Sequence, residues 1–266
     1  MPYNCAVIVR EIWDTRDLVG TVLKEDGGLN EAVLTTRFEP EDLNALEMAL
    51  QLKDKQGGKV TAISVGQPRN VDVLRECLYR DVDAVVRVDV PSVKDFDTAT
   101  LARMIANTAQ KAGPFDLILA GLDIVDGENS LLGTHVAASL GVDAVTYVDA
   151  LDEIAPGRVV CKRQIENGSE VVETKLPALL VVGVALLKDD PRTPRSAKAT
   201  LKLKHKKTPI PVSTLQDLGI GDPASLKTTV LAGYEGIPQR VIESKQVDPN
   251  DEPSLKSMLD DIRRGG

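Results

Sequence analysis

Short runs of β-branched and other apolar residues alternate with amphipathic stretches through the first two thirds of this 266-residue chain. Such alternation is typical of βαβ units, so it predicts an α/β fold with a doubly wound, mainly parallel sheet. Because 42% of the residues are hydrophobic, the chain can bury a substantial core. This excludes a fibre, a mini-protein and a disordered tail.

The expected elements follow from the periodicity of the apolar residues and from proline and glycine at their ends. Pro40 opens a helix at its first position, and this helix runs to Gly57. Beyond residue 145 the apolar runs are separated by loops, which predicts antiparallel or mixed pairing. We expect strands at 5–9, 59–65, 84–88, 116–120, 158–163, 170–175 and 179–184, and further helices at 73–80, 98–111 and 131–140.

Two segments interrupt this pattern. Residues 19–37, with Asp26-Gly27-Gly28 in the middle, predict a hairpin insertion. Two prolines within 189–195 place the end of the core near residue 188. We therefore expect an α/β domain at 1–188 and an extended C-terminal arm at 189–266. The arm ends in a short helix at 254–264 and has too few apolar clusters to fold alone, so we expect it to pack on another chain.

The net charge of −8 and the pI near 5.0 argue against nucleic acid or an anionic membrane as the partner of the whole molecule. No apolar stretch approaches the length of a membrane span, and the first residues do not read as a secretion signal. We expect an intracellular protein, cytoplasmic or in a mitochondrial matrix. Cys5, Cys77 and Cys161 lie far apart in apolar stretches, which predicts buried thiols and no metal site.

The usual catalytic signatures are absent from the sequence, and it contains only two histidines, His135 and His205. His135 lies just inside an expected helix, where a packing or surface role is more common than a general base. We therefore expect no catalytic residues.

The segment 117–133 runs from a buried strand through a glycine-bearing loop into a helix, where ligands bind in open α/β sheets. Asn129 or Ser130 can cap that helix, and the free N–H groups of its first turn can bind a phosphate. Asp123, Asp126 and Glu128 would repel a phosphate unless they point away or serve the turn. From chemistry alone, a nucleotide phosphate and a merely well-capped loop remain equal alternatives.

Over residues 3–215 the sequence resembles the β subunits of electron-transfer flavoproteins. No single motif is diagnostic, but several occur in register. They are Val7-Ile-Val-Arg-Glu-Ile-Trp13-Asp14-Thr15, Glu39-Pro40 with the following Ala45-Leu-Glu-Met-Ala-Leu-Gln-Leu-Lys53, Ile63-Ser64-Val65-Gly66-Gln67-Pro68, Val125-Asp126-Gly127-Glu128, Lys175-Leu176-Pro177-Ala178, and the basic arm from Pro194-Arg195 to Lys207.

This resemblance implies a fold of the adenine-nucleotide-binding type and a non-catalytic subunit of a heterodimer. The α subunit would hold most of the FAD, and this chain would bind AMP, or a second FAD in bifurcating members. A dehydrogenase and a quinone reductase or similar redox protein would be the clients. Carried over by position, the nucleotide would contact Ile8, Glu39, Asp42, Val65, Gly66, Gly121, Asp126, Gly127, Glu128, Asn129, Ser130, Leu131 and Leu132.

The resemblance also places Trp13 and Thr15 towards the flavin of the partner. A buried packing residue is the competing interpretation of Trp13. The loop Asp126-Gly127-Glu128 is nearer to that of the bifurcating members, without deciding the matter.

Three positions depart from the family pattern. Glu39 replaces an asparagine, which brings a carboxylate near the adenosine site. Leu131-Leu132 removes a side chain that could bind phosphate, and Ala199 stands where the family arm carries a docking Leu or Ile. We therefore expect either an altered client or docking through Leu201 or Leu203.

The arm from 192 to 207 contains seven Lys or Arg, including Arg195, and no acidic residue. It lacks interleaved aromatic residues, so docking to an acidic protein face is favoured over nucleic acid. The alternative for the whole chain is a stand-alone nucleotide sensor of the universal-stress type, which would need no flavoprotein partner.

Overall fold

The computed structural model describes residues 1–122, 131–185, 189–229, 232, 247–248 and 250–264. The main sheet has the order β11–β5–β4–β1–β6–β10–β7–β8–β9, and it is parallel from β11 to β7 and antiparallel from β7 to β9. Its strands are β1 (Cys5–Ile8), β4 (Val60–Gly66), β5 (Ala84–Asp89), β6 (Leu117–Gly121), β7 (Asp143–Ala155), β8 (Arg158–Ile165), β9 (Gly168–Lys175), β10 (Ala178–Val182) and β11 (Val212–Ser213). The predicted doubly wound α/β fold is confirmed.

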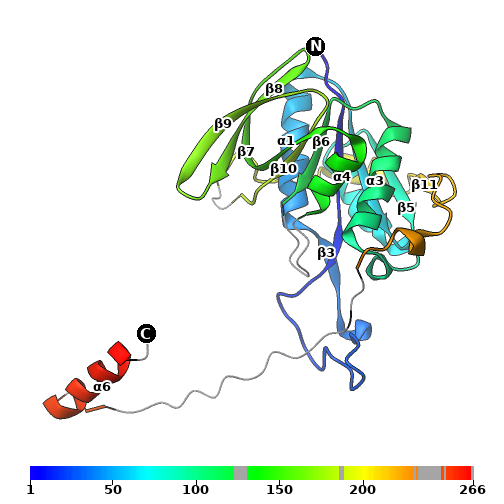
Figure 1. Cartoon of the computed structure of the whole chain (residues 1–266). Helices are drawn as coiled ribbons and strands as arrows, with labels where there is room; N and C mark the ends of the chain where they lie inside the picture. Colours follow the sequence, from blue (N-terminus) through cyan, green and yellow to red (C-terminus); the bar gives the residue numbers. More distant parts are fainter. Residues whose placement is uncertain (123–130, 186–188, 230–231, 233–246, 249, 265–266) are drawn as a thin grey trace.

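Helices cover both faces of the parallel part of the sheet (Figure 1). One face packs against α1 (Pro40–Gln56) and α2 (Val71–Tyr79), and the other against α3 (Thr98–Ala112) and α4 (Leu132–Leu140). The central strands are buried on both sides, which is why β1, β6 and β10 read as continuous apolar runs in the sequence.

The helix ends follow the sequence signals. Pro40 is the first residue of α1, and the side chain of Glu39 caps it by accepting a hydrogen bond from the backbone N–H of Glu41. Gly57, with φ of 77°, ends the same helix, a conformation that favours glycine.

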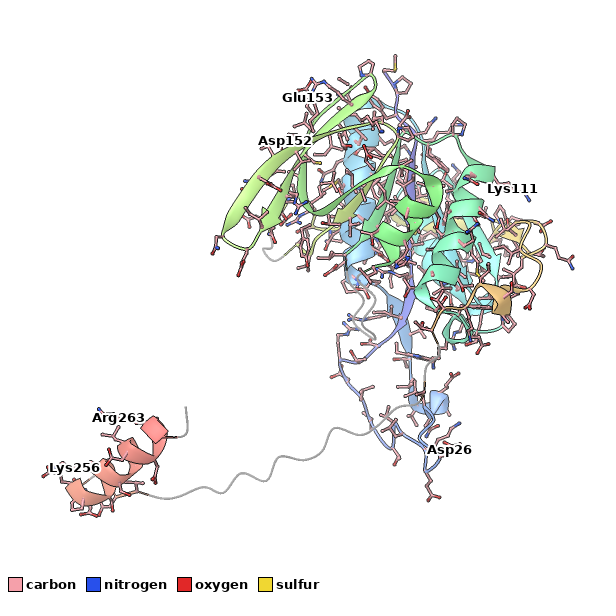
Figure 2. All side chains as sticks on the ribbon, in the orientation of Figure 1. Asp26, Lys111, Asp152, Glu153, Lys256 and Arg263 are labelled. Atoms are coloured by element: carbon pink, nitrogen blue, oxygen red, sulfur yellow. The ribbon has the colours of Figure 1, made fainter. Side chains whose placement is uncertain are left out.

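The predicted hairpin insertion takes a different form. Its base is a separate antiparallel pair, β2 (Glu11–Trp13) and β3 (Thr36–Phe38), so one strand lies before the segment that the sequence suggested. Nearer its end, Leu23 and Leu29 form an antiparallel bridge around the Asp26-Gly27-Gly28 turn. The segment projects from the sheet, with Asp26 at its far end (Figure 2). It includes a short 3₁₀ turn, η1 (Glu31–Val33).

Much of the region after 188 packs on the same chain. Arg192 is buried, β11 pairs with β5, and Leu218 and Ile220 belong to the core on the α3–α4 face. This region also contains α5 (Ala199–His205), which contacts α2, and the 3₁₀ turn η4 (Pro223–Leu226), which contacts α3. The helix α6 (Glu252–Arg264) lies apart from the α/β body (Figure 1).

The boundary at 188 and the packing of the arm on a partner stay predictions. The three cysteines are buried and free, as expected. Within the described residues, no helix is both long enough and apolar enough to cross a lipid bilayer.

Candidate functional site

A cavity of about 460 Å³ lies at the carboxyl ends of β1, β4 and β5. In the sheet order β1 stands between β4 and β6, and the connections from β1 towards β4 and from β5 to β6 cross opposite faces. This is the topological switch point, where open α/β sheets bind ligands. The surface of the cavity is mostly apolar, as in many small-molecule sites, although ten of its lining side chains are polar or charged.

The projecting segment closes one side of this cavity. Leu18, Val22, Leu29 and Leu34 line it from that segment. The opposite wall comes from the sheet and from the first turns of α3 and α4. The projecting segment between β2 and β3 is therefore part of the candidate site.

A buried ion pair fixes the strand ends beside the cavity. The guanidinium of Arg10 donates from Nε (2.9 Å) and Nη2 (2.7 Å) to the two carboxylate oxygens of Asp42. Asp42 also accepts from the backbone N–H groups of Arg10 (2.8 Å) and Gly121 (3.1 Å). Burial alone lowers the pKa of Arg10, but its pairing with Asp42 raises the pKa overall. One carboxylate thus ties α1 to the ends of β1 and β6.

Trp13 stands at the end of β2 beside two cations. The Arg69 guanidinium lies 4.9 Å from the ring centroid, and the Lys94 ammonium lies 4.6 Å from it. Lys94 also pairs with Glu31 at 2.9 Å, and Arg69 pairs with Glu11 at 3.5 Å. The hydrogen bond from Lys94 lowers the pKa of Glu31. These contacts join the projecting segment to the loops after β4 and β5.

Of the residues predicted to bind the nucleotide or face the flavin, six line the cavity. Four others that the structure describes do not line it. Glu39 is buried as the cap of α1, Asp42 is engaged with Arg10, Gly121 is buried at the end of β6, and Leu131 is exposed before α4. Asp126, Gly127, Glu128, Asn129 and Ser130 lie outside the described residues. Those in the cavity wall are Ile8, Trp13, Thr15, Val65, Gly66 and Leu132.

The predicted docking residues are not among those that line the cavity. Arg195 donates to Glu47 (2.9 Å) and to Asp54 (2.8 Å), and these bonds raise its pKa. Ala199 begins α5 and is exposed. Leu201 is half-buried, whereas Leu203 is 81% exposed. The docking role of these residues stays a prediction.

Sequence reasoning missed several polar residues of the cavity wall. Arg10 follows a buried strand directly, and a charged residue at that place is a signal that it needs a buried partner. Arg69 and Asn70 follow the Gly66-Gln67-Pro68 turn at the end of β4, and Lys94 follows β5. All of them follow the carboxyl ends of strands. That position is the signal that could have identified them as candidate ligand-binding residues.

The fold is that of a doubly wound α/β protein, with a candidate small-molecule site in the cavity at its switch point. The electron transfer flavoprotein domain, as a family model, matches residues 27–209. The electron transfer flavoprotein subunit beta of Thermoanaerobacterium thermosaccharolyticum is 30% identical over 250 residues, which cover 94% of this chain and 89% of that protein.

Two further relatives carry names of electron-transfer proteins or come from the same set of matches. The caffeyl-CoA reductase-Etf complex subunit CarD of Acetobacterium woodii is 31% identical over 70% of each chain. Protein FixA of Bradyrhizobium diazoefficiens is 30% identical over 85% of this chain and 80% of its own. The chain therefore belongs to the electron transfer flavoprotein family, and the stand-alone sensor is not favoured.

Proposed function

We propose that this chain is the β subunit of a heterodimeric electron-transfer flavoprotein, which passes electrons between a dehydrogenase and a downstream acceptor. Its relationship to proteins named as electron-transfer β subunits supports this role. The observation that carries it in the structure is the cavity at the switch point of the sheet. The chain supplies no catalytic residues of its own in this proposal, and it positions redox cofactors and tunes them electrostatically.

The cavity is the proposed place of a nucleotide held by this chain, either AMP or a second FAD. Both ligands contain an adenosine 5′-phosphate, so the same apolar walls can receive either one. Ile8, Val65 and Leu132 line the space from β1, β4 and α4. An electron-transferring FAD would be shared with or held by the α subunit, on the side of Trp13 and Thr15.

The partners in this proposal are the α subunit, a dehydrogenase and a quinone reductase or similar client. The cytoplasm, or the mitochondrial matrix in a eukaryote, is the proposed compartment. Leu203 and the lysines around it on α5 offer an exposed apolar residue within a basic surface, which suits an acidic docking face on a client.

The test is to purify the complex from its native host, denature it and identify the released nucleotides by mass. We expect one FAD and one AMP per heterodimer, or two FAD if the complex bifurcates electrons. A chain that purifies alone, with neither flavin nor partner, would overturn the proposal and favour the nucleotide sensor.

A further inference from the structure

The projecting segment, residues 14–35, lines the cavity without a core of its own (Figure 2). None of its residues is buried, and its regular structure is limited to the turn η1 and the bridge between Leu23 and Leu29. Regions that bury few apolar side chains open at a low free energy, so this segment can move while the α/β body stays folded. Four of its apolar side chains nevertheless line the cavity, namely Leu18, Val22, Leu29 and Leu34.

Backbone hydrogen bonds hold the segment together and define its base. The N–H of Asn30 donates to the carbonyl of Val22 at 2.8 Å, within the segment. The N–H of Asp14 donates to the carbonyl of Thr35 at 2.8 Å and continues the pairing of β2 with β3. The segment can therefore move as one piece about this base.

An ion pair joins the segment to the loop after β5. Glu31 pairs at 2.9 Å with Lys94 of the 3₁₀ turn η3 (Val93–Asp95). The hydrogen bond from Lys94 lowers the pKa of Glu31, and the charges of Arg69 and Lys24 lower it further. The Glu31 side chain is 54% exposed, and exposed pairs contribute little to stability. This pair can hold the segment against the body and still release it.

We propose that residues 14–35 form a hinged lid over the cavity, which the pair between Glu31 and Lys94 holds closed. The lid opens to admit a ligand and closes on it with its four apolar side chains. A ligand that contacts both the lid and the opposite wall binds the closed form more tightly, so it shifts the population towards that form. The identity of the ligand as AMP or FAD rests on the proposed function, whereas the lid does not.

The experiment measures access to the wall opposite the lid. Leu101 lines the cavity from α3 and is buried, so the thiol of Leu101→Cys should react with iodoacetamide chiefly when the lid is open. This reagent is neutral, and the full-length chain is used. The three native thiols are buried, and burial raises the pKa of each, so they should react slowly.

Val93→Cys is the matched control for the position of the thiol. Val93 lines the same cavity next to Lys94, but it is 37% exposed and needs no opening to react. Dividing the labelling rate of Leu101→Cys by that of Val93→Cys removes the direct effect of nearby charges on the thiol. Ile105→Cys, on the same wall, replaces Leu101→Cys if that variant does not fold.

Charge changes at the ion pair then test what holds the lid. Glu31→Lys places a cation against Lys94, so the normalised labelling rate should rise about threefold to fivefold, as loss of an exposed ion pair allows. Adding Lys94→Glu to Glu31→Lys restores an opposite pair and should return the rate towards that of the parent. Glu173→Lys is the control, because it breaks an exposed pair with Arg158 away from the cavity. It should leave the rate unchanged.

Equal normalised rates in the parent and Glu31→Lys, or no recovery in the double variant, would overturn the lid. Addition of AMP or FAD to the same assay separates this inference from the proposed function. Labelling that depends on the ion pair but not on either nucleotide would support the lid and count against the proposed ligand. Labelling that either nucleotide slows, with no effect of the charge changes, would support the ligand and overturn the lid.

Discussion

At the scale of single residues, Gly121 is a position with little room for a side chain. A Cβ there would lie 2.6 Å from Oδ1 of Asp42 and 2.7 Å from its backbone nitrogen. Gly121→Ala should push β6 away from α1 and disturb the pair between Arg10 and Asp42. We expect a loss of about 1–3 kcal/mol in the free energy of unfolding, the usual cost of overpacking. Urea denaturation measures it.

Gly221→Ala is the control for that substitution. No atom lies within 4 Å of a Cβ at Gly221. Its free energy of unfolding should stay within about 0.5 kcal/mol of the parent. Equal urea midpoints for the two variants would contradict the packing argument at Gly121.

The sequence predicted those site residues whose place follows from strand ends. Ile8, Val65 and Gly66 end apolar runs, so their position at the carboxyl edge could be predicted. The engagement of Asp42 with Arg10 could not, because 32 residues separate them and their contact depends on the packing of α1. Asn70 was missed because asparagine in a turn is usually exposed, whereas here it is buried at the end of the turn after β4.

At the scale of elements, the segment at 190–195 is fastened to α1. Asn44 donates to the carbonyl of Arg192 at 3.0 Å, and Glu47 pairs with Arg195. Arg192 reaches Asp149 (2.7 Å) and Asp190 (2.7 Å). These contacts hold the segment that leads into α5, and they explain why the arginines of the basic arm are engaged within the chain.

The pair between Asp190 and Arg192 predicts a pH-dependent stability. The hydrogen bond from Arg192 lowers the pKa of Asp190 in the folded chain below its ordinary value of 3.8. A carboxyl with a lowered folded pKa stabilises the fold fully above pH 3.8 and less as pH falls through the folded value. Asp190→Asn should therefore cost about 1–3 kcal/mol at pH 7, and this difference should shrink below pH 3.8. Thermal unfolding over pH 2–7 measures it.

The control for this pair is Glu170→Gln, because Glu170 pairs with Arg163 on the exposed edge of the sheet. It should change the free energy of unfolding by less than about 0.5 kcal/mol. A constant difference between Asp190→Asn and the parent at every pH would contradict the assigned role of the carboxylate.

The regular elements of the doubly wound core were predictable because burial on both faces leaves a continuous apolar run. The long strand β7 was not, since much of it is half-buried or exposed and its sequence mixes charged with apolar residues. The two residues of β11 form a strand only through pairing with β5, more than a hundred residues earlier. Neither β7 nor β11 could therefore be predicted from its local sequence.

At the scale of the whole molecule, the structure separates the two leucines predicted for docking. Leu203 is 81% exposed on α5 and Leu201 is half-buried. Leu203→Ala should leave thermal stability unchanged and slow electron delivery from the proposed client dehydrogenase about fivefold to tenfold, as loss of an interface anchor does. Stopped-flow reduction of the flavin in the complex measures it. Leu201→Ala is the comparison, and a slower reaction there alone would move the docking site to Leu201.

The helix α6 leads to a prediction about assembly. Leu259 and Ile262 are exposed on it, and it stands apart from the α/β body (Figure 1). An isolated helix of 13 residues is marginal in water, so an apolar stripe of this kind needs a surface to cover it. We expect removal of residues 250–266 to leave the thermal unfolding of the chain unchanged and to weaken its association with the α subunit. Sedimentation of the mixed subunits measures that association. The contrary result is a shortened chain that unfolds at a lower temperature and associates as before. It would mean that α6 packs on its own chain, because its removal then takes packing from the α/β body.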